Sequence, residues 1–239
     1  MKDFQNIGVV LQLAAMLILL IKIVFTRNCS GLSGRTQILH ALAFSTRFLD
    51  LPDELEVSIL FFALKIVYLL IAYMTVAVIF IACRRTYEQE YDAFRIDYLV
   101  GACLTAAIIT SYKHLDILSI LWYFSVYLET FAILPQIFFT RNADYAGSSL
   151  VFYVGLLACY RLFDVVHWGY GIWTASLADS LFVVVNGTLQ LLIYCGYFSW
   201  MVPLFQTRYD HLRDANAMSE VTKVSSDVTS NGIKNTAEY

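Results

Sequence analysis

One acidic residue, Glu129, lies in the middle of an almost unbroken apolar run, ILWYFSVYLETFAILPQ, at residues 120–136. A run of this length predicts a helix that crosses a membrane. A carboxyl group at that depth costs several kcal/mol unless it is paired or faces water, so Glu129 is a candidate functional residue. The alternative is a structural role, in which Glu129 pairs with a basic residue on a neighbouring helix and holds the bundle together.

Two Arg-x-x-Asp pairs, Arg47 with Asp50 and Arg161 with Asp164, lie in two other apolar segments. Residues three apart share one face of a helix, so each pair presents both of its charges to the same side. We expect both pairs and Glu129 to surround one cavity. The alternative is that each pair is self-contained and neutralises its own charge locally.

Three further residues stand close to these charges in the sequence. His167 lies one turn after Asp164, where a histidine is either a hydrogen-bonded core residue or a titratable group of the cavity. Pro135 and Gln136 close the apolar run that contains the acid. Because proline cannot donate a hydrogen bond to the carbonyl four residues earlier, we predict a bend there, with Pro135 and Gln136 as a candidate hinge.

The composition is that of a polytopic helical membrane protein surrounded by a lipid bilayer. Of the 239 residues, 59% are hydrophobic and 15% are charged, whereas soluble domains have about a quarter of their residues charged. The five cysteines show no CxxC spacing and no histidine partner, so we expect reduced thiols and no metal. No nucleophile–base constellation or phosphate-binding loop is present, so we expect no enzyme, no cofactor and no nucleic acid partner.

Seven spans are predicted, at about residues 4–25, 36–49, 57–83, 98–110, 120–139, 149–168 and 178–205. Residues 1–205 then form a transmembrane domain, and residues 206–239, rich in Ser, Thr, Asn and Asp, form a disordered tail. One side of the membrane carries most of the basic residues, namely Arg27, Arg35, Arg84, Arg85, Arg95, Arg141, Arg208 and Arg213. The positive-inside rule makes that side cytosolic, with the tail, and makes the N-terminus lumenal or extracellular.

The chain also repeats itself. The tetrapeptide FTRN at residues 25–28 recurs at residues 139–142, and the two Arg-x-x-Asp pairs are separated by the same offset. We therefore predict two parallel three-helix copies, related by an axis along the membrane normal and joined by a single linking helix. The copies and the linker occupy about residues 4–83, 115–205 and 98–110. Sites in repeat-built membrane proteins lie between the copies, so we expect the charged cavity there, open to the lumen.

Long stretches of the chain resemble one known family, the KDEL receptors, also called ER lumen protein-retaining receptors. The matching segments are CSGLSGRTQ (29–37), FSTRFLDL (44–51), LKIVYL (64–69), YDAFRIDYLV (91–100), LWYFSVYLETFAILPQ (121–136), Tyr160-Arg161 and Tyr194-Cys195. The resemblance covers nearly everything from Phe4 to about Val202. It implies seven helices in two three-helix repeats, similar to PQ-loop and SWEET-like proteins.

The resemblance also implies a function. Members of the family bind the C-terminal Lys-Asp-Glu-Leu-type tail of escaped lumenal proteins in the acidic Golgi and return with it to the endoplasmic reticulum in coated vesicles. The implied partners are therefore C-terminal peptides of lumenal proteins and vesicle coat proteins. By the same resemblance, Arg47 meets the carboxylate of the ligand and Asp50 favours its basic end. Glu129 and Tyr160 match residues of the family's cavity.

Several positions depart from the family pattern. Gln5 and Gly171 replace ligand-binding arginines, Gln12 replaces a histidine implicated in pH sensing, Ser119 and Gly196 replace acids, Asp164 and His167 replace a tyrosine and an asparagine, and FQTRYDHLRD replaces a lysine cluster. We therefore expect an acidic tail to bind more weakly than it binds to a typical family member. We expect either pH-independent binding or acid-favoured binding that depends on His167, with Glu129 as the next candidate.

The alternative function is a small-solute carrier on the same scaffold. Its Arg-x-x-Asp pairs and Glu129 would be solute or proton sites, and Pro135 would be a hinge. The two functions differ in one observable feature. A carrier needs a continuous polar path past Gln136, whereas a receptor needs a cavity that is closed on the cytosolic side.

Overall fold

The computed structural model describes residues 2–49, 59–112, 116–143, 148–174 and 180–201. Asp50, the acidic residues 53–56 and the predicted tail 206–239 lie outside the described residues. The described elements are α1 (Lys2–Thr26), α2 (Gly34–Arg47), α4 (Ile59–Ala77), the π-helical turn η1 (Val78–Ala82), α5 (Ile96–Thr110), α6 (Ile117–Phe131), α7 (Leu134–Ala143), α8 (Ser148–Thr174) and a final helix, Ser180–Met201. With η1 continuing α4, and α6 and α7 forming one broken crossing, these elements confirm the seven predicted spans.

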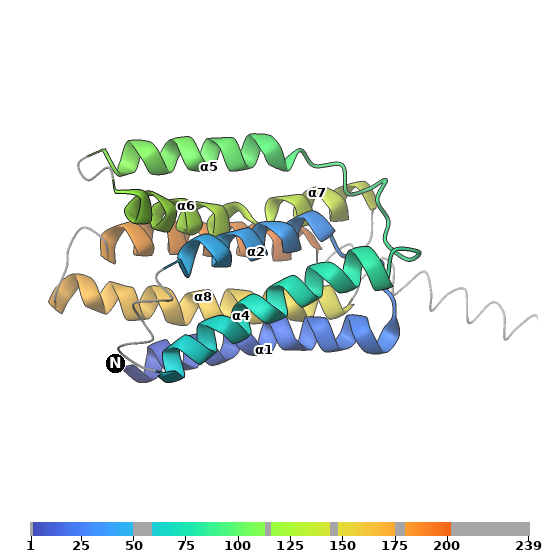
Figure 1. The fold of residues 1–239 in the computed structure, drawn as a ribbon, viewed down its shortest axis with the longest axis horizontal. Helices are drawn as coiled ribbons and strands as arrows, with labels where there is room; N and C mark the ends of the chain where they lie inside the picture. The colour runs from blue at the N-terminus through green and yellow to red at the C-terminus, as the bar shows by residue number, and fades with distance from the viewer. Residues whose placement is uncertain (1, 50–58, 113–115, 144–147, 175–179, 202–239) are drawn as a thin grey trace, which may run out of the picture.

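The helices run side by side along one direction, as Figure 1 shows. Most of the seven crossings are long and apolar enough to span a membrane by themselves, and α5 is apolar but shorter. Helix α2 is the exception, because it has only 14 residues and is more polar than its neighbours. It can be short because the loop before it, which contains the buried residues Cys29 and Leu32, folds back into the bundle. Gly31 turns the chain there with a φ of 82°, a conformation that glycine adopts without strain.

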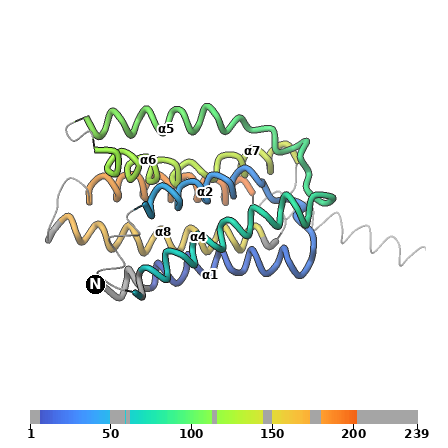
Figure 2. Tube along the Cα trace, viewed as in Figure 1, coloured from blue at the N-terminus to red at the C-terminus, as the bar shows by residue number. Residues whose placement is uncertain are grey.

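The main helix–helix contacts run between the two predicted copies and not within them. Among helices α1 to α8, the most extensive packing joins α1 of the first copy to α8 of the second, and the next joins α2 to α6. Each first helix therefore packs on the second helix of the other copy. Figure 2 shows α1, in blue, beside α8, in yellow. Helix α5 packs on α6 at the edge of the bundle. The arrangement agrees with a pair of copies related by an axis along the bundle, while the repeat boundaries remain a prediction.

The crossing that contains Glu129 is interrupted, as Pro135 predicts. Helix α6 ends at Phe131, and α7 begins at Leu134. Between them the amide of Ala132 donates a weak bond of 3.4 Å to the carbonyl of Glu129. Pro135 is the second residue of α7, a position where its missing N–H leaves no helical bond unmade. The predicted bend is therefore confirmed as a break, and whether it acts as a hinge remains a prediction.

Candidate functional site

The buried carboxylate of Glu129 is the centre of a charged cluster. The Glu129 side chain is only 2% exposed. Its Oε2 accepts a hydrogen bond of 2.5 Å from Nη1 of Arg47, and its Oε1 lies 2.7 Å from Nη2 of Arg161. Oε1 also accepts from the hydroxyl of Tyr160 at 3.0 Å and from the amide of Gln12 at 3.4 Å. Four donors from three other helices therefore satisfy a charge that would otherwise be expensive to bury.

Local features of α2 and α6 place Arg47 against this acid. Arg47 is the last residue of α2, where a cation is favoured by the negative end of the helix dipole. Its Nε donates to the hydroxyl of Ser125 at 3.2 Å. Ser125 and Glu129 are four residues apart and share one face of α6, so they hold the guanidinium at two points. The guanidinium is thereby fixed in one orientation.

The second arginine, Arg161, enters the cluster from α8. Its Nη1 donates to Asp164 at 2.7 Å, so Arg161 bridges Asp164 and Glu129. Gly187 on the final helix allows that helix to approach α8 closely at Arg161. A Cβ at this position would lie 2.6 Å from Val165 and 3.3 Å from Cδ of Arg161. The Arg161–Asp164 pair forms as predicted, but it is not self-contained, because Arg161 also forms an ion pair with Glu129.

The two arginines differ in their exposure. The side chain of Arg47 is 21% exposed, whereas that of Arg161 is 5% exposed. Nη2 of Arg47 forms no hydrogen bond to another described residue, since the bonds of Arg47 to Ser125 and Glu129 use Nε and Nη1. Arg47 is thus the more accessible of the two arginines, and Asp164, at 20% exposed, is similarly accessible.

The structure joins Arg47, Glu129, Tyr160, Arg161 and Asp164 in one connected set. Asp50 lies outside the described residues. His167 is half-buried, stands edge-on to Trp168 with a centroid separation of 5.9 Å, and finds no partner for its Nδ1 among the described residues. The role of each of these residues in ligand binding remains a prediction.

A small cavity with room for about one water molecule lies beside Glu129. Its lining is Gln12, Met16, Gln37, His40, Phe44, Ala72, Glu129, Tyr153, Leu157, Tyr160 and Tyr194. Sequence reasoning assigned no role to Gln37, His40 or Tyr153. A signal was present for the first two, because residues 37, 40, 44 and 47 recur at helical spacing on one face of α2.

On the α7 side of the break, a second buried network of hydrogen bonds lies between α7, the α1–α2 loop and the final helix. Gln136 accepts from the amide of Ser33 at 2.8 Å and donates to the carbonyl of Gly31 at 3.0 Å and to Thr140 at 3.3 Å. Thr140 is also 2.8 Å from the hydroxyl of Tyr197 on the final helix. These contacts tie the α1–α2 loop, α7 and the final helix together.

The same network continues to Asp92, in the connection between η1 and α5. The fully buried Asp92 carboxylate accepts from the hydroxyl of Ser33 at 2.9 Å, the amide of Arg35 at 3.1 Å and the hydroxyl of Tyr87 at 2.5 Å. Burial and the neighbouring carboxylate raise the pKa of the Tyr87 phenol above its usual range. We call Ser33, Asp92, Gln136 and Thr140 the polar seal, and no sequence argument predicted it.

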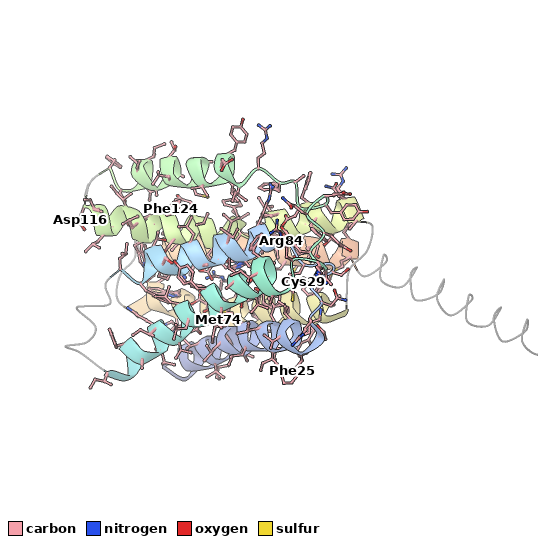
Figure 3. All side chains as sticks on the ribbon, turned by 45° about the vertical axis from the view of Figure 1, so that its right-hand side comes forward. Phe25, Cys29, Met74, Arg84, Asp116 and Phe124 are labelled. Atoms are coloured by element: carbon pink, nitrogen blue, oxygen red, sulfur yellow. The ribbon has the colours of Figure 1, made fainter. Side chains whose placement is uncertain are left out.

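The polar seal lies at the arginine-rich end of the bundle. Arg35 follows Ser33 by two residues, and Arg141 follows Thr140 directly. Figure 3 shows Cys29 and Arg84 toward this end, with Asp116 at the opposite end. The one-water cavity is therefore separated from the arginine-rich end by a layer of fully buried, hydrogen-bonded side chains.

Comparison with known proteins agrees with the resemblance read from the sequence. The family model described as ER lumen protein retaining receptor matches residues 28–171. ER lumen protein-retaining receptor 3 of Danio rerio is 38% identical over 198 residues, which cover 83% of this chain and 91% of the relative. ER lumen protein-retaining receptor 2 of Homo sapiens is 37% identical over 198 residues, with 83% and 92% covered.

A further relative, ER lumen protein-retaining receptor 3 of Mus musculus, is 37% identical over the same length, with 83% and 91% covered. The matched range of the family model contains Arg47, Glu129 and Arg161, the three charges at the centre of the cluster. The names of these relatives describe receptors and not enzymes. The chain therefore belongs to the ER lumen protein retaining receptor family, a family of multi-pass membrane receptors of the endoplasmic reticulum and Golgi.

Proposed function

We propose that this protein binds the C-terminal tail of lumenal proteins and supports their retrieval from the Golgi to the endoplasmic reticulum. The observation that carries the proposal is the state of Arg47. Its guanidinium is held by Ser125 and Glu129, yet its side chain is 21% exposed and its Nη2 forms no hydrogen bond to another described residue. A fixed guanidinium with a free edge suits the bidentate capture of a carboxylate, which every peptide tail carries.

The charges of the cluster support an anionic ligand at this point. Arg161 has two carboxylates within reach, Glu129 and Asp164, while the described partner acid of Arg47 is Glu129 alone. Within the described parts of the chain, Glu129 is thus shared, and Arg47 has no carboxylate to itself. A ligand carboxylate would complete the charge balance in surroundings where water screens poorly. The neighbouring cavity holds about one water molecule, so the peptide would lie on the exposed side of Arg47.

The closed arginine-rich end favours a receptor over a carrier. In the orientation that we propose from the positive-inside rule, this end is cytosolic and the N-terminus is lumenal. A carrier would need a polar path past Gln136, but the amide of Gln136 is fully buried and engaged in three hydrogen bonds. Retrieval in vesicles would bring coat proteins to the same cytosolic end as partners.

The proposal is tested by measuring peptide binding to the purified full chain in lipid nanodiscs. Fluorescent peptides that end in Lys-Asp-Glu-Leu, and peptides with a less acidic ending, are titrated between roughly pH 5 and pH 7.5. Each peptide is compared with its amidated form, which lacks the terminal charge. We expect binding of at least one free tail and a loss of binding on amidation. Equal binding of free and amidated tails, or no binding of any tail, would overturn the proposal.

A further inference from the structure

Two neighbouring segments at the arginine-rich end of the bundle carry four cations. The apolar spans Ile7–Thr26 and Phe62–Ala82 end just before the arginines of this group, which places those arginines at the depth of lipid headgroups. We call the four cations the basic cluster, which consists of Lys22 near the end of α1, Arg27 directly after α1, and Arg84 and Arg85 shortly after η1.

Buried contacts hold the two segments of the basic cluster together. The thiol of Cys83 lies 4.0 Å from the carbonyl of Ile23, and the amide of Cys29 donates to the hydroxyl of Thr86 at 3.1 Å. Burial raises the pKa of the Cys29 thiol, and the nearby positive charge of Lys22 acts against that rise. The cations of both segments therefore surround one packed floor and do not lie on separate loops.

Arg27 adopts a backbone conformation that is unfavourable for a residue with a long side chain. Its amide donates to the carbonyl of Ile23 at 2.9 Å and ends α1, and its φ is 48°. Glycine is the usual residue at this position after a helix, because it has no Cβ to clash in the left-handed region. An arginine at a position that favours glycine points to a use for its guanidinium.

The basic cluster has no ion-pair partner within the described ranges of the chain. The ion pairs there join Arg47 and Arg161 to Glu129 and Asp164, far from these cations. The next acid after Arg85 in the sequence is Glu88, which accepts a hydrogen bond from Ser30 at 2.9 Å. Arg27, Arg84 and Arg85 are exposed. Like charges that are not compensated repel one another, so an anion placed among them is attracted by all of them.

Large apolar side chains lie next to the basic cluster on its membrane side. Phe25 is 83% exposed and Ile81 is 80% exposed, and both belong to the last turns of their spans. Figure 3 shows Phe25 and Arg84 toward the same end of the bundle. In a bilayer such side chains contact acyl chains just below the headgroups. The surface therefore offers cations at headgroup depth and apolar contacts directly beneath them.

We propose that this surface is a binding site for an anionic phospholipid. The headgroup phosphate lies among Arg27, Arg84 and Arg85, whose planar guanidinium groups suit two-point contact with phosphate oxygens. Lys22 adds a fourth positive charge, and the acyl chains run along Phe25 and Ile81. A soluble phosphate has no chains and would use only the cations, so the ligand is a lipid.

This lipid site is independent of the tail binding proposed above. It lies at the opposite end of α2 from Arg47, and in the proposed orientation it faces the cytosolic leaflet, which carries anionic lipids. A bound lipid links α1 to η1 and stabilises the folded chain in proportion to its occupancy. Its phosphate contacts are electrostatic, so binding weakens as the salt concentration rises.

The test uses native mass spectrometry of the purified full chain, which counts the lipid molecules retained by each variant. Phosphatidylinositol phosphate is titrated against phosphatidylcholine for the wild type, Arg27→Gly, Arg85→Gln and Arg141→Gln. We expect the wild type to retain the anionic lipid selectively, and Arg27→Gly and Arg85→Gln to bind it about fivefold more weakly. Arg141→Gln removes an exposed arginine from α7, which lies apart from α1 in Figure 1, and should bind as the wild type does.

Arg27→Gly separates lipid binding from folding. Because glycine relieves the left-handed strain, the melting temperature of this variant in phosphatidylcholine alone should be no lower than that of the wild type. Its weaker lipid binding then cannot come from unfolding. Equal retention of both lipids by the wild type, or the same loss in Arg141→Gln as in Arg85→Gln, would overturn the proposal. Binding of soluble inositol phosphate as tight as that of the lipid would overturn it as well.

Discussion

At the scale of residues, the site is one acid shared by two arginines. Glu129 takes a hydrogen bond from Arg47 on α2 and contacts Arg161 on α8, so its single charge joins two helices that do not follow each other in the chain. A buried ion pair adds little stability over an apolar pair of the same size, but removing one partner leaves an uncompensated charge. The cluster is therefore better understood as a specific geometry than as a source of stability.

Replacing the exposed arginine should weaken ligand binding without unfolding the protein. We expect Arg47→Ala to cost about 2–5 kcal/mol of tail binding, since a desolvated charge pair is lost. Arg47→Lys should restore part of this, because lysine supplies the charge but not the planar fork. Calorimetric titration of the tail measures both. Arg84→Ala, which removes an exposed arginine at the opposite end, is the control. Wild-type affinity in Arg47→Ala would contradict the assignment.

Replacing the shared acid should instead destabilise the fold. Glu129→Gln leaves Arg47 and Arg161 near each other with no charge between them, and we expect a loss of about 3–5 kcal/mol in the free energy of unfolding. Denaturant or thermal unfolding in detergent measures the change. Glu90→Gln removes an exposed acid from a loop and should leave stability unchanged. Equal stability of the two variants would show that the buried cluster is not held by charge.

Much of this cluster could be predicted from the sequence, but not all of it. An acid inside an apolar run is expensive, so partners for Glu129 had to exist. The sequence predicted Arg47 and Arg161 around the same cavity, but it suggested Lys65 as the partner of the acid, whereas the structure pairs the acid with the two arginines and places the Lys65 ammonium over the Phe48 ring. His40 could not be assigned, because its position on α2 shows which face it occupies but not which helix covers that face. The cover comes from α6 and α8, and their placement depends on contacts between residues far apart in the chain.

At the scale of elements, the break between α6 and α7 separates two polar networks. Glu129 lies in the last turn of α6 and Gln136 in the first turn of α7, so one interrupted crossing contributes to both the charged cluster and the polar seal. The break was predictable, because it depends only on the missing N–H of Pro135. The polar seal was not, since Ser33, Asp92 and Gln136 come from three separate segments and only the folded chain brings them together.

Opening the polar seal should expose the α1–α2 loop. Gln136→Leu would leave the amide of Ser33 and the carbonyl of Gly31 without partners, at a cost of about 1–3 kcal/mol for each group. Burial, together with the neighbouring Cys83, raises the pKa of the Cys29 thiol to about 12, so little reactive thiolate forms at neutral pH. Release of the loop lowers that pKa toward its ordinary value. We therefore expect labelling of Cys29 by a water-soluble maleimide to accelerate more than about tenfold.

Mass spectrometry of the digested protein assigns the label to Cys29. Gln89→Leu, which changes an exposed glutamine in the following loop, serves as the matched variant and should label as slowly as the wild type. Labelling of Cys29 at the wild-type rate in Gln136→Leu would show that the loop is held by its apolar packing and not by the glutamine.

At the scale of the whole molecule, a nearly symmetric scaffold carries an asymmetric site. The packing of α1 on α8 and of α2 on α6 pairs equivalent helices of the two copies. Each copy also contributes one arginine to the charged cluster. The acid is not duplicated. At the offset that relates Arg47 to Arg161, the residue matching Glu129 is Ala15, which is small and fully buried. As a result of this asymmetry, the site is partly exposed at the Arg47 side chain and buried at the Arg161 side chain.

The orientation of this scaffold in the membrane is a separate prediction. The arginine-rich end should face the cytosol, because translocation of arginine-rich loops is disfavoured. A glycosylation acceptor added after Tyr239 should therefore stay unmodified in cells, while one added before Met1 should be modified. Gel mobility before and after glycosidase treatment distinguishes the two. Modification of the tag after Tyr239 would reverse the orientation and place the polar seal on the lumenal side.

The extensive contact between α1 and α8 has a consequence for how the chain is made. Helix α1 is synthesised first, yet its main packing partner begins only at Ser148. At typical rates the ribosome needs on the order of 10 s to add the intervening residues, and throughout that time Gln12 has no Tyr160 beside it. A polar side chain facing lipid is the kind of defect that membrane quality control recognises. Nascent chains that stop before α8 should therefore be held by insertion chaperones or degraded, and they should not accumulate as stable fragments.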